Sequence, residues 1–421
     1  MSTATDALPL EETLTPDDPA ALAEVVRAAA DVRRAVYPIG GGTSLGFGLP
    51  ATVPGLGISL AGLTRVVDYP ARDMTITVEA GISMSTLTQT MAAERQHLPI
   101  DVPFADRATL GGVIATNWSG PRRLGSGTIR DYVIGISAVD GRGIAFKGGG
   151  RVVKNVAGYD FCKLLIGSLG TLAIVTQVTL KTRPLPQTST WIICDLPTLD
   201  LAERLLADAV ALPAMPAALE LVAGPRWRDH PLGGQGNGQS VGQLALALEG
   251  TEAEVSWLAG EVIRRWQDAA ARQPLQVSHE ESGAVLRRLT DSPATTDLPG
   301  EWPTTLKFSL PPSAVVGMVG KILASFPSAS VQAHAASGIV WVQLYDVAPH
   351  LLARKVVQQW QSAARAVGGA VVLTSHPQSS ELTRHVVWGP SRDDWTVMAT
   401  VKRQFDPYGV LNPGRFIFPA S

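Results

Sequence analysis

The stretch PIGGGTSLGFG occupies residues 38–48, and five of its eleven residues are glycine. It overlaps the end of AVYPI, residues 35–39, an apolar run typical of a short strand. A strand that ends in a glycine run can wrap a phosphate group, because bare backbone N–H groups converge there without a Cβ in the way. Thr43 and Ser44 add hydroxyl donors. The alternative is a glycine-rich turn that binds no ligand.

Two familiar phosphate-binding motifs do not fit this run. No Gly-Lys-Ser/Thr follows at the spacing of a P-loop. The glycines do not stand at the first, third and sixth positions of the dinucleotide fingerprint, and no helical pattern follows at once. The run is therefore either a phosphate cradle of another kind or a glycine-rich turn that binds no ligand.

A second glycine-rich segment runs from residue 106 to residue 131. Thr109 is placed to cap a short helix that starts with Gly111 and Gly112, where free N–H groups would suit a pyrophosphate. Asn117 and Ser119 offer further donors. The Arg122–Arg123 pair could neutralise phosphate, or it could be a solvated surface pair.

A third segment covers residues 148–176, with glycines at 158, 167 and 170 among apolar residues. Lys154 and Asn155 form either a polar patch at a ligand or an exposed loop. Gly170 opens a long strand that Pro184 ends, and the backbone of Ile174 is placed to pair with the edge of a planar heterocycle.

The composition indicates a globular protein that acts on small molecules. The 421 residues carry a formal net charge of -2 without a basic block, which argues against nucleic acid as a partner. Two cysteines, Cys162 and Cys194, are too few for an iron–sulfur cluster or a disulfide framework. No signal peptide and no run of about 18 apolar residues is visible. We therefore predict a cytoplasmic protein without a transmembrane segment, with peripheral attachment to the inner membrane through partners as the alternative.

The chain divides by texture into an α+β unit and a second domain. Residues 1–185 mix glycine loops with short helices and strands, including an Asp18-capped helix and a hairpin that turns at Asp140 and Gly141. Residues 186–394 twice show the order strand–helix–strand–strand–helix–strand, which is ferredoxin-like with an antiparallel sheet. The pattern of residues 395–421 predicts an amphipathic helix followed by a turn. We expect this C-terminal segment to return to the first domain.

Taken together, the three glycine-rich segments resemble the FAD-binding domain of the vanillyl-alcohol oxidase / p-cresol methylhydroxylase (PCMH) superfamily. RDYVIGISAVDGRG, GGRVVKNVAGYD and FDPYGVLNPGRF are similar to segments of the smaller FAD-binding subunit in bacterial glycolate oxidase complexes. The resemblance implies a two-subdomain PCMH-type FAD-binding domain and a ferredoxin-like cap domain.

The resemblance also implies which residues hold FAD. The pyrophosphate would be held by Gly40, Gly41, Gly42, Thr43 and Ser44; the cradle would continue through Thr109, Gly111, Gly112, Asn117 and Ser119; Gly170, Ile174, Asn412 and Arg415 would complete the flavin side. Some relatives attach flavin covalently through a histidine near the glycine loop. No histidine lies between residues 38 and 96, so we predict non-covalent FAD.

The resemblance implies oxidation of a small 2-hydroxy acid, glycolate to glyoxylate, with FAD as hydride acceptor. Hydroxy-acid dehydrogenases of this kind carry a histidine-rich segment like HGDGN. Here residues 333–346 read AHAASGIVWVQLYD, with His334 but neither a carboxylate nor a second histidine close by in that segment. A metal-assisted site is therefore not predicted. His376, Arg384 and His385 are weak catalytic candidates, and surface positions are their alternative.

Electrons on reduced flavin must leave, and the chain has no cluster ligands or nicotinamide-binding motif of its own. The resemblance implies a larger FAD-bearing catalytic subunit and an iron–sulfur subunit as partners. Two other classes stay open: a stand-alone FAD-dependent 2-hydroxy-acid oxidase or dehydrogenase, and a non-catalytic scaffold with a degenerate site.

Overall fold

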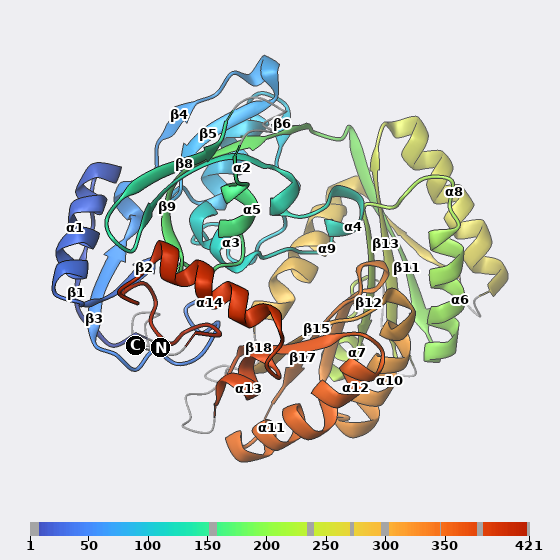
Figure 1. Ribbon diagram of the computed structural model, residues 1–421. Coiled ribbons are helices and arrows are strands. Elements are labelled where there is room, and N and C mark those ends of the chain that lie inside the picture. Colours follow the sequence, from blue (N-terminus) through green and yellow to red (C-terminus); the bar gives the residue numbers. More distant parts are fainter. Residues whose placement is uncertain are drawn as a thin grey trace. The chain divides into compact units, whose positions relative to one another are not determined.

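The computed structural model describes residues 8–150, 158–233, 240–269, 273–295, 303–345, 347–376 and 382–418. The chain forms two compact units (Figure 1). The first combines Met1–Trp118, Thr128–Leu185 and Leu382–Ser421, and the second combines Ser119–Gly127 with Pro186–Glu381. The change of unit after residue 185 falls where the sequence texture changes. The C-terminal return begins at residue 382 rather than 395, and residues 119–127 group with the second unit.

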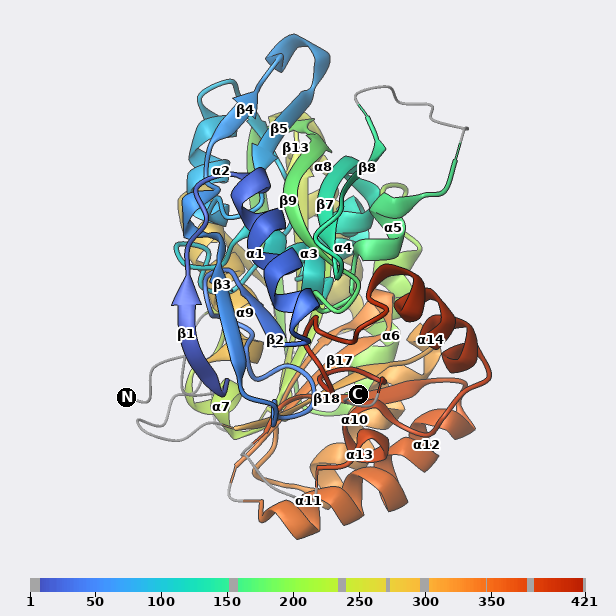
Figure 2. The same cartoon turned by 60° about the vertical axis from the view of Figure 1, so that its left-hand side comes forward.

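The first unit contains a small parallel sheet in the order β1-β3-β2, with α1 beside it (Figure 2). Its elements are β1 (Leu10–Leu14), α1 (Pro19–Asp31), β2 (Ala35–Ile39) and β3 (Gly55–Ser59). Asp18 caps α1 as predicted, accepting a hydrogen bond from the Ala21 N–H at 2.8 Å, and Pro19 occupies the first turn. Leu22 and Val26 on its inner face are fully buried.

The first unit also contains a five-stranded antiparallel sheet in the order β4-β5-β9-β7-β8. Its strands are β4 (Val66–Asp68), β5 (Thr75–Glu79), β7 (Val133–Asp140), β8 (Ala145–Gly149) and β9 (Ala173–Lys181); β6 (Gln96–His97) pairs separately with β10 (Arg183–Pro184). The connecting helices are α2 (Met84–Ala92), α3 (Leu110–Thr116) and α5 (Phe161–Leu165). The predicted hairpin is present, and its turn follows Asp140.

The C-terminal segment supplies α13 (Arg384–Trp388) and α14 (Asp394–Phe405). After α14 the chain runs along the end of β2, where Leu411 forms a parallel bridge with Val36. One apolar core, which includes Val36, Ile76, Val178 and Leu411, therefore joins both sheets and the tail of the first unit.

The second unit is built on one antiparallel sheet in the order β14-β11-β13-β12-β16-β17-β15-β18. Its first half contains β11 (Thr188–Leu196), α6 (Leu199–Val210), β12 (Ala218–Ala223), α7 (Pro225–Asp229), β13 (Gly242–Gly250), α8 (Glu252–Ala269) and β14 (Leu275–Val277), with α4 (Arg123–Ser126) added from the earlier segment. Its second half follows α9 (His279–Asp291) and contains β15 (Thr304–Ser309), α10 (Val315–Ser325), β16 (Ser330–His334), β17 (Ile339–Leu344), α11 (Pro349–Lys355), α12 (Gln361–Ala366) and β18 (Ala370–Ser375).

Each half of this sheet has the ferredoxin-like strand order, fourth-first-third-second, and the halves join through β12 and β16. The predicted ferredoxin-like, antiparallel architecture is confirmed. One sheet face packs against α7 and α9, around Trp227, Val285 and Leu289. Because cross-strand partners share a face, every side chain paired with a residue of this face also points to it.

Candidate functional site

The glycine loop, residues 40–44, begins directly after β2. Within the part of the chain that the structure describes, the amide N–H groups of residues 41–44 donate no hydrogen bond to the protein. These residues are partly buried, and Gly42 has a φ of 69°. Successive unpaired amides around a left-handed residue form a concave anion-binding nest. The loop therefore fits a phosphate, which would satisfy these donors.

The loop runs directly against the segment that precedes α3. A Cβ on Gly40 would lie 2.2 Å from Thr109 Oγ1, and a Cβ on Gly41 would lie 1.6 Å from Arg107 O. Both distances are far below van der Waals contact. A side chain on Gly41 would require the backbone to move, whereas one on Gly40 would displace the Thr109 hydroxyl. Two glycine-rich segments that the sequence separates by more than sixty residues are thus in contact.

The start of α3 differs from the prediction of free N–H groups. Thr109 does cap the helix, and its Oγ1 accepts from the Gly112 N–H at 3.3 Å. The Leu110 N–H donates to Ile82 O at 3.0 Å, and the Gly111 N–H donates to Ala80 O at 2.7 Å. The donors of this turn are satisfied inside the protein because the helix packs onto the end of β5. Gly111 and Gly112 therefore provide space rather than unpaired donors.

Asn117 and Ser119 belong to different units. Asn117 ends α3 with a φ of 51°, next to Gly167. Ser119 lies in the second unit, where its Oγ accepts a hydrogen bond from Arg123 Nη1 at 2.9 Å. Arg122 of the same segment lies 3.4 Å from Glu249 Oε1. Arg122 is thus an ion-pair partner inside the second unit. Lys154 and Asn155 lie outside the described residues.

The loop at residues 167–171 meets the C-terminal tail. Gly170 has a φ of 65°, and a Cβ on it would lie 3.1 Å from Asn412 Nδ2. Asn412 Nδ2 donates to Leu169 O at 2.7 Å. Ile174 lies in β9 opposite Val139, with its side chain buried in the core. Gly170 and Asn412 are thus brought together.

Arg415 holds the stretch that directly follows the glycine loop. Its Nη2 donates to Leu45 O and, at 2.8 Å, to Phe47 O, while its own carbonyl accepts from the Leu49 N–H at 2.9 Å. Burial lowers the pKa of Arg415 to about 10. Arg415 therefore acts on the loop backbone, and its Nη2 already has two acceptors.

In the second unit, His334 has a carboxylate neighbour that sequence reasoning missed. Glu220 of β12 lies opposite His334 of β16, and its Oε1 is 2.6 Å from His334 Nδ1. Trp341 Nε1 is 3.3 Å from His334 Nε2. Because an indole N–H only donates, His334 Nε2 accepts and Nδ1 carries the proton that bonds Glu220. Both side chains are buried, and both ring nitrogens have partners.

A second missed residue, Lys307 of β15, lies on the same face of the sheet. Lys307 pairs with Trp341 of β17, and its Nζ is 5.3 Å from the centroid of the Trp341 ring. Its Nζ makes no hydrogen bond or ion pair with any residue in the described ranges. Burial, followed by the charge of Arg123, lowers the pKa of Lys307 to about 8. A partly buried cation with no counter-charge among the described residues is a candidate anion site.

Both missed residues left a signal in the sequence. Lys307 is the single charge in TTLKFSL, and Glu220 is the single charge in AALELVAG. Each side chain alternates with apolar neighbours along a strand that has buried residues on both faces. A lone charge in such a strand points to a specific partner or ligand.

The weak catalytic candidates are divided between the units. His376 follows β18 in the second unit, whereas Arg384 and His385 start α13 in the first. Arg384 Nε and Trp388 Nε1 are buried without a hydrogen-bond partner. The Trp388 ring packs against Phe47, with ring centroids 5.4 Å apart. The C-terminal segment thus brings one buried donor without a hydrogen-bond partner, Trp388 Nε1, to the stretch that follows the glycine loop.

Among the described residues, no helix has both the length and the apolar character that a membrane crossing requires. No group of three or more His, Cys, Asp or Glu side chains within the described ranges is placed to hold a metal ion.

Two family models match the sequence: the FAD binding domain over residues 11–148, and the FAD linked oxidases, C-terminal domain, over residues 185–416. Among curated proteins, glycolate oxidase subunit GlcE of Escherichia coli (strain K12) is 28% identical over 355 residues, which cover 83% of this chain and 84% of that protein. Glycolate oxidase subunit GlcD of Bacillus subtilis (strain 168) is 31% identical over 204 residues, 48% of this chain and 43% of that protein.

D-2-hydroxyglutarate dehydrogenase of Xanthomonas citri pv. viticola is 39% identical over 185 residues, 44% of this chain and 39% of that enzyme. The chain thus spans less than half the length of the GlcD and D-2-hydroxyglutarate dehydrogenase relatives. A solved structure of alkyldihydroxyacetonephosphate synthase superposes with a TM-score of 0.70 at 17% identity, covering 95% of this chain and 76% of that one. At this identity the likeness shows a shared fold.

Proposed function

Because this chain belongs to the FAD-linked oxidases and its cofactor is FAD, we propose that it is the FAD-binding subunit of a glycolate oxidase complex. The observation that carries the proposal is the similarity to glycolate oxidase subunit GlcE across more than four fifths of both chains. The other relatives named above match over less than half of their own length.

The FAD diphosphate is assigned to the glycine loop of the first unit. The unpaired amides of residues 41–44 would donate to its oxygens, and the missing Cβ atoms of Gly40 and Gly41 leave room for the loop against Thr109. Gly170 and Asn412 form the second contact segment. When bound, FAD supplies a hydride acceptor for the oxidation of an alcohol carbon. Attachment is non-covalent in this proposal, because residues 38–96 contain no histidine.

Lys307 is the candidate anion-binding residue of the second unit. With a pKa of about 8, its ammonium group is mostly charged at neutral pH and has no anionic partner among the described residues. A 2-hydroxy acid would supply that partner through a charge-assisted hydrogen bond. His334 is less suited to remove a proton, because Nδ1 already bonds Glu220 and Nε2 accepts from Trp341.

The second candidate function is a stand-alone FAD-dependent 2-hydroxy-acid dehydrogenase. It is favoured by local identity to D-2-hydroxyglutarate dehydrogenase and to D-lactate dehydrogenase of Archaeoglobus fulgidus, 33% identical over 224 residues. In this reading the chain itself binds the substrate and passes electrons to a soluble acceptor.

Purification of the tagged chain from its own cells separates the two candidates. Flavin and iron are quantified in the material that is captured, and glycolate oxidation is measured with an artificial electron acceptor. A subunit of the complex would capture a larger flavoprotein and an iron–sulfur protein, and the chain alone would turn over glycolate slowly. A flavin-loaded single chain that oxidises glycolate at the full rate would refute the subunit proposal.

A further inference from the structure

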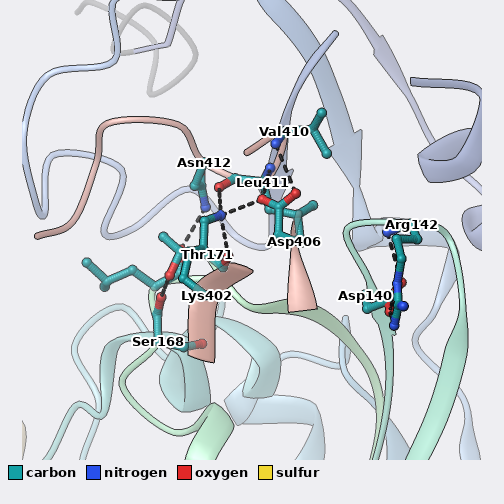
Figure 3. A network of polar contacts seen from close by, with 10 residues as sticks. Asp140, Arg142, Ser168, Thr171, Lys402, Asp406, Val410, Leu411 and Asn412 are labelled. Atoms are coloured by element: carbon teal, nitrogen blue, oxygen red, sulfur yellow. Dashed lines mark hydrogen bonds and ion pairs between the residues drawn. The ribbon is translucent and has the colours of Figure 1, made fainter. Parts of the chain in front are cut away.

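Lys402 of α14 is a buried cation that joins three separate segments of the first unit (Figure 3). Its Nζ donates to Thr171 O at 2.7 Å, to Leu411 O at 3.2 Å and to the carboxylate of Asp406. Thr171 belongs to the loop that contains Gly170, and Leu411 belongs to the tail beside β2. One ammonium group therefore fixes the position of the helix, the loop and the tail.

Asp406 completes this cluster from the other side. Its carboxylate accepts the Val410 N–H at 3.0 Å and the Leu411 N–H at 2.8 Å, and it also neutralises Lys402. Burial lowers the pKa of Lys402, and the Asp406 charge opposes that effect. A buried pair with every partner in place holds one geometry, because loss of either partner leaves an uncompensated charge.

The tail that follows Asp406 contacts both proposed FAD loops. Asn412 reaches the 167–171 loop through Leu169 O, and its own N–H donates to Val36 O at 2.9 Å on the strand that enters the glycine loop. Arg415 binds the carbonyls of Leu45 and Phe47 beyond that loop. The backbone of the cofactor cradle is thus tied to residues 402–415 on both sides.

We propose that residues 402–415 form a clamp whose docking is coupled to FAD binding, with Lys402, Asp406 and Asn412 as positioning residues. The inference rests on the proposed placement of FAD at the two loops. None of the three side chains needs to touch the cofactor. They hold the loops in the arrangement that receives it, so FAD stabilises the docked clamp and the docked clamp raises FAD affinity by the same factor.

Asn412→Gly is the central test. Asn412 has a φ of 45°, which glycine adopts without strain. The change therefore removes the hydrogen bond from the Asn412 side-chain amide to Leu169 O and leaves the backbone relaxed. We expect the dissociation constant of FAD, measured by recovery of flavin fluorescence, to rise about tenfold, with a broadened flavin absorption band.

Arg95→Gly is the matched control, because Arg95 also has a positive φ, of 54°, and is exposed. The FAD affinity of this variant should stay within about twofold of wild type.

The reverse coupling is measured by limited trypsin digestion of the full chain with and without FAD. Cleavage after Arg403, an exposed residue of α14, should slow on FAD addition in the wild type and respond less in Asn412→Gly. Lys402→Met should weaken FAD binding more strongly than Asn412→Gly. Lys321→Met, which removes an exposed charge in the second unit, is its control. If Lys402→Met does not fold, Asn412→Gly carries the test.

Unchanged FAD affinity in Asn412→Gly, or equal cleavage rates with and without FAD, would overturn the clamp while leaving the flavoprotein assignment intact. A wild-type chain that binds no FAD would instead remove the placement on which the clamp rests.

Discussion

Gly41 shows how one missing Cβ shapes the proposed cofactor site. A Cβ at this position would lie 1.6 Å from Arg107 O. A Cβ on Gly46, which lies just beyond the glycine loop, would meet no atom within 4 Å. We therefore expect Gly41→Ala to displace the loop and to weaken FAD binding at least about a hundredfold, a loss of roughly 3 kcal/mol. Gly46→Ala should retain the wild-type flavin content. Flavin absorbance per mole of purified protein measures both, and equal flavin content in the two variants would contradict the assigned cradle.

Lys307 is expected to serve substrate binding at a cost in stability. Lys307→Met keeps an apolar stem against Trp341 and removes the charge. If Lys307 holds the substrate carboxylate, KM for glycolate should rise about 10- to 100-fold, the value of a charge-assisted hydrogen bond. The KM is measured on the complex with its partners, and Lys321→Met, which removes a charge from a different element, is the control. An unchanged KM would contradict the role of Lys307.

The lowered pKa of Lys307 predicts how the free energy of unfolding depends on pH. The pKa of Lys307 is about 8 in the folded chain against an ordinary value of 10.5. Between these values the unfolded chain holds a proton that the folded chain has released, so the free energy of unfolding rises with pH in the wild type. Lys307→Met lacks this rise. The variant should be more stable than wild type by about 1–3 kcal/mol below pH 8, and the gap should close near pH 10.5. Urea unfolding of both proteins across this range measures the gap; a gap that is constant with pH would contradict the lowered pKa.

At the scale of elements, β16 and β17 place His334 between Glu220 and Trp341. Both nitrogens of the imidazole have partners, so a metal ion would have to displace a bond that is already made. We expect dialysis against a chelator to leave the melting temperature of the chain unchanged, and elemental analysis to find well below one transition metal per chain. Trp341→His removes the indole donor and is expected to create zinc or manganese binding; a wild-type chain that loses stability on chelation would contradict this arrangement.

Local signals predicted many of these elements, because they act over a few residues. Asp18 and Thr109 begin their helices as caps, and the hairpin turns after Asp140, as the sequence indicates. The bond between Glu220 and His334 joins residues 114 apart through the pairing of β12 with β16, and no local pattern specifies that register. The sequence likewise does not show that the N–H groups at the start of α3 are satisfied. Their acceptors, Ala80 O and Ile82 O, come from a turn that is distant in the sequence.

At the scale of the whole molecule, the sequence texture predicts two domains but not which unit each segment joins. Residues 119–127 follow the α3 motif directly, yet Gly125 N–H donates to Ala217 O and the segment groups with the second unit. A Cβ on Gly125 would lie 2.9 Å from Ala217 Cα, so the close approach explains the glycine. The cradle role implied for Ser119 stays a prediction, whereas Gly40, Gly41 and Thr109 are already in contact within the first unit.

Electrons on a reduced flavin have no evident acceptor side chain within this chain. The chain has two cysteines, and burial raises the pKa of Cys162 and of Cys194 to about 11, so neither thiol is a ready thiolate ligand or redox partner. A reduced flavin in this chain therefore needs an acceptor on another protein or in solution. We expect glycolate to reduce the flavin of the isolated chain once, and reoxidation of that flavin to stay slow until the co-purifying flavoprotein and iron–sulfur protein are added back. Stopped-flow absorbance of the flavin band measures both rates. Equal rates with and without the added proteins, with turnover sustained by a soluble acceptor, would identify the chain as a complete dehydrogenase.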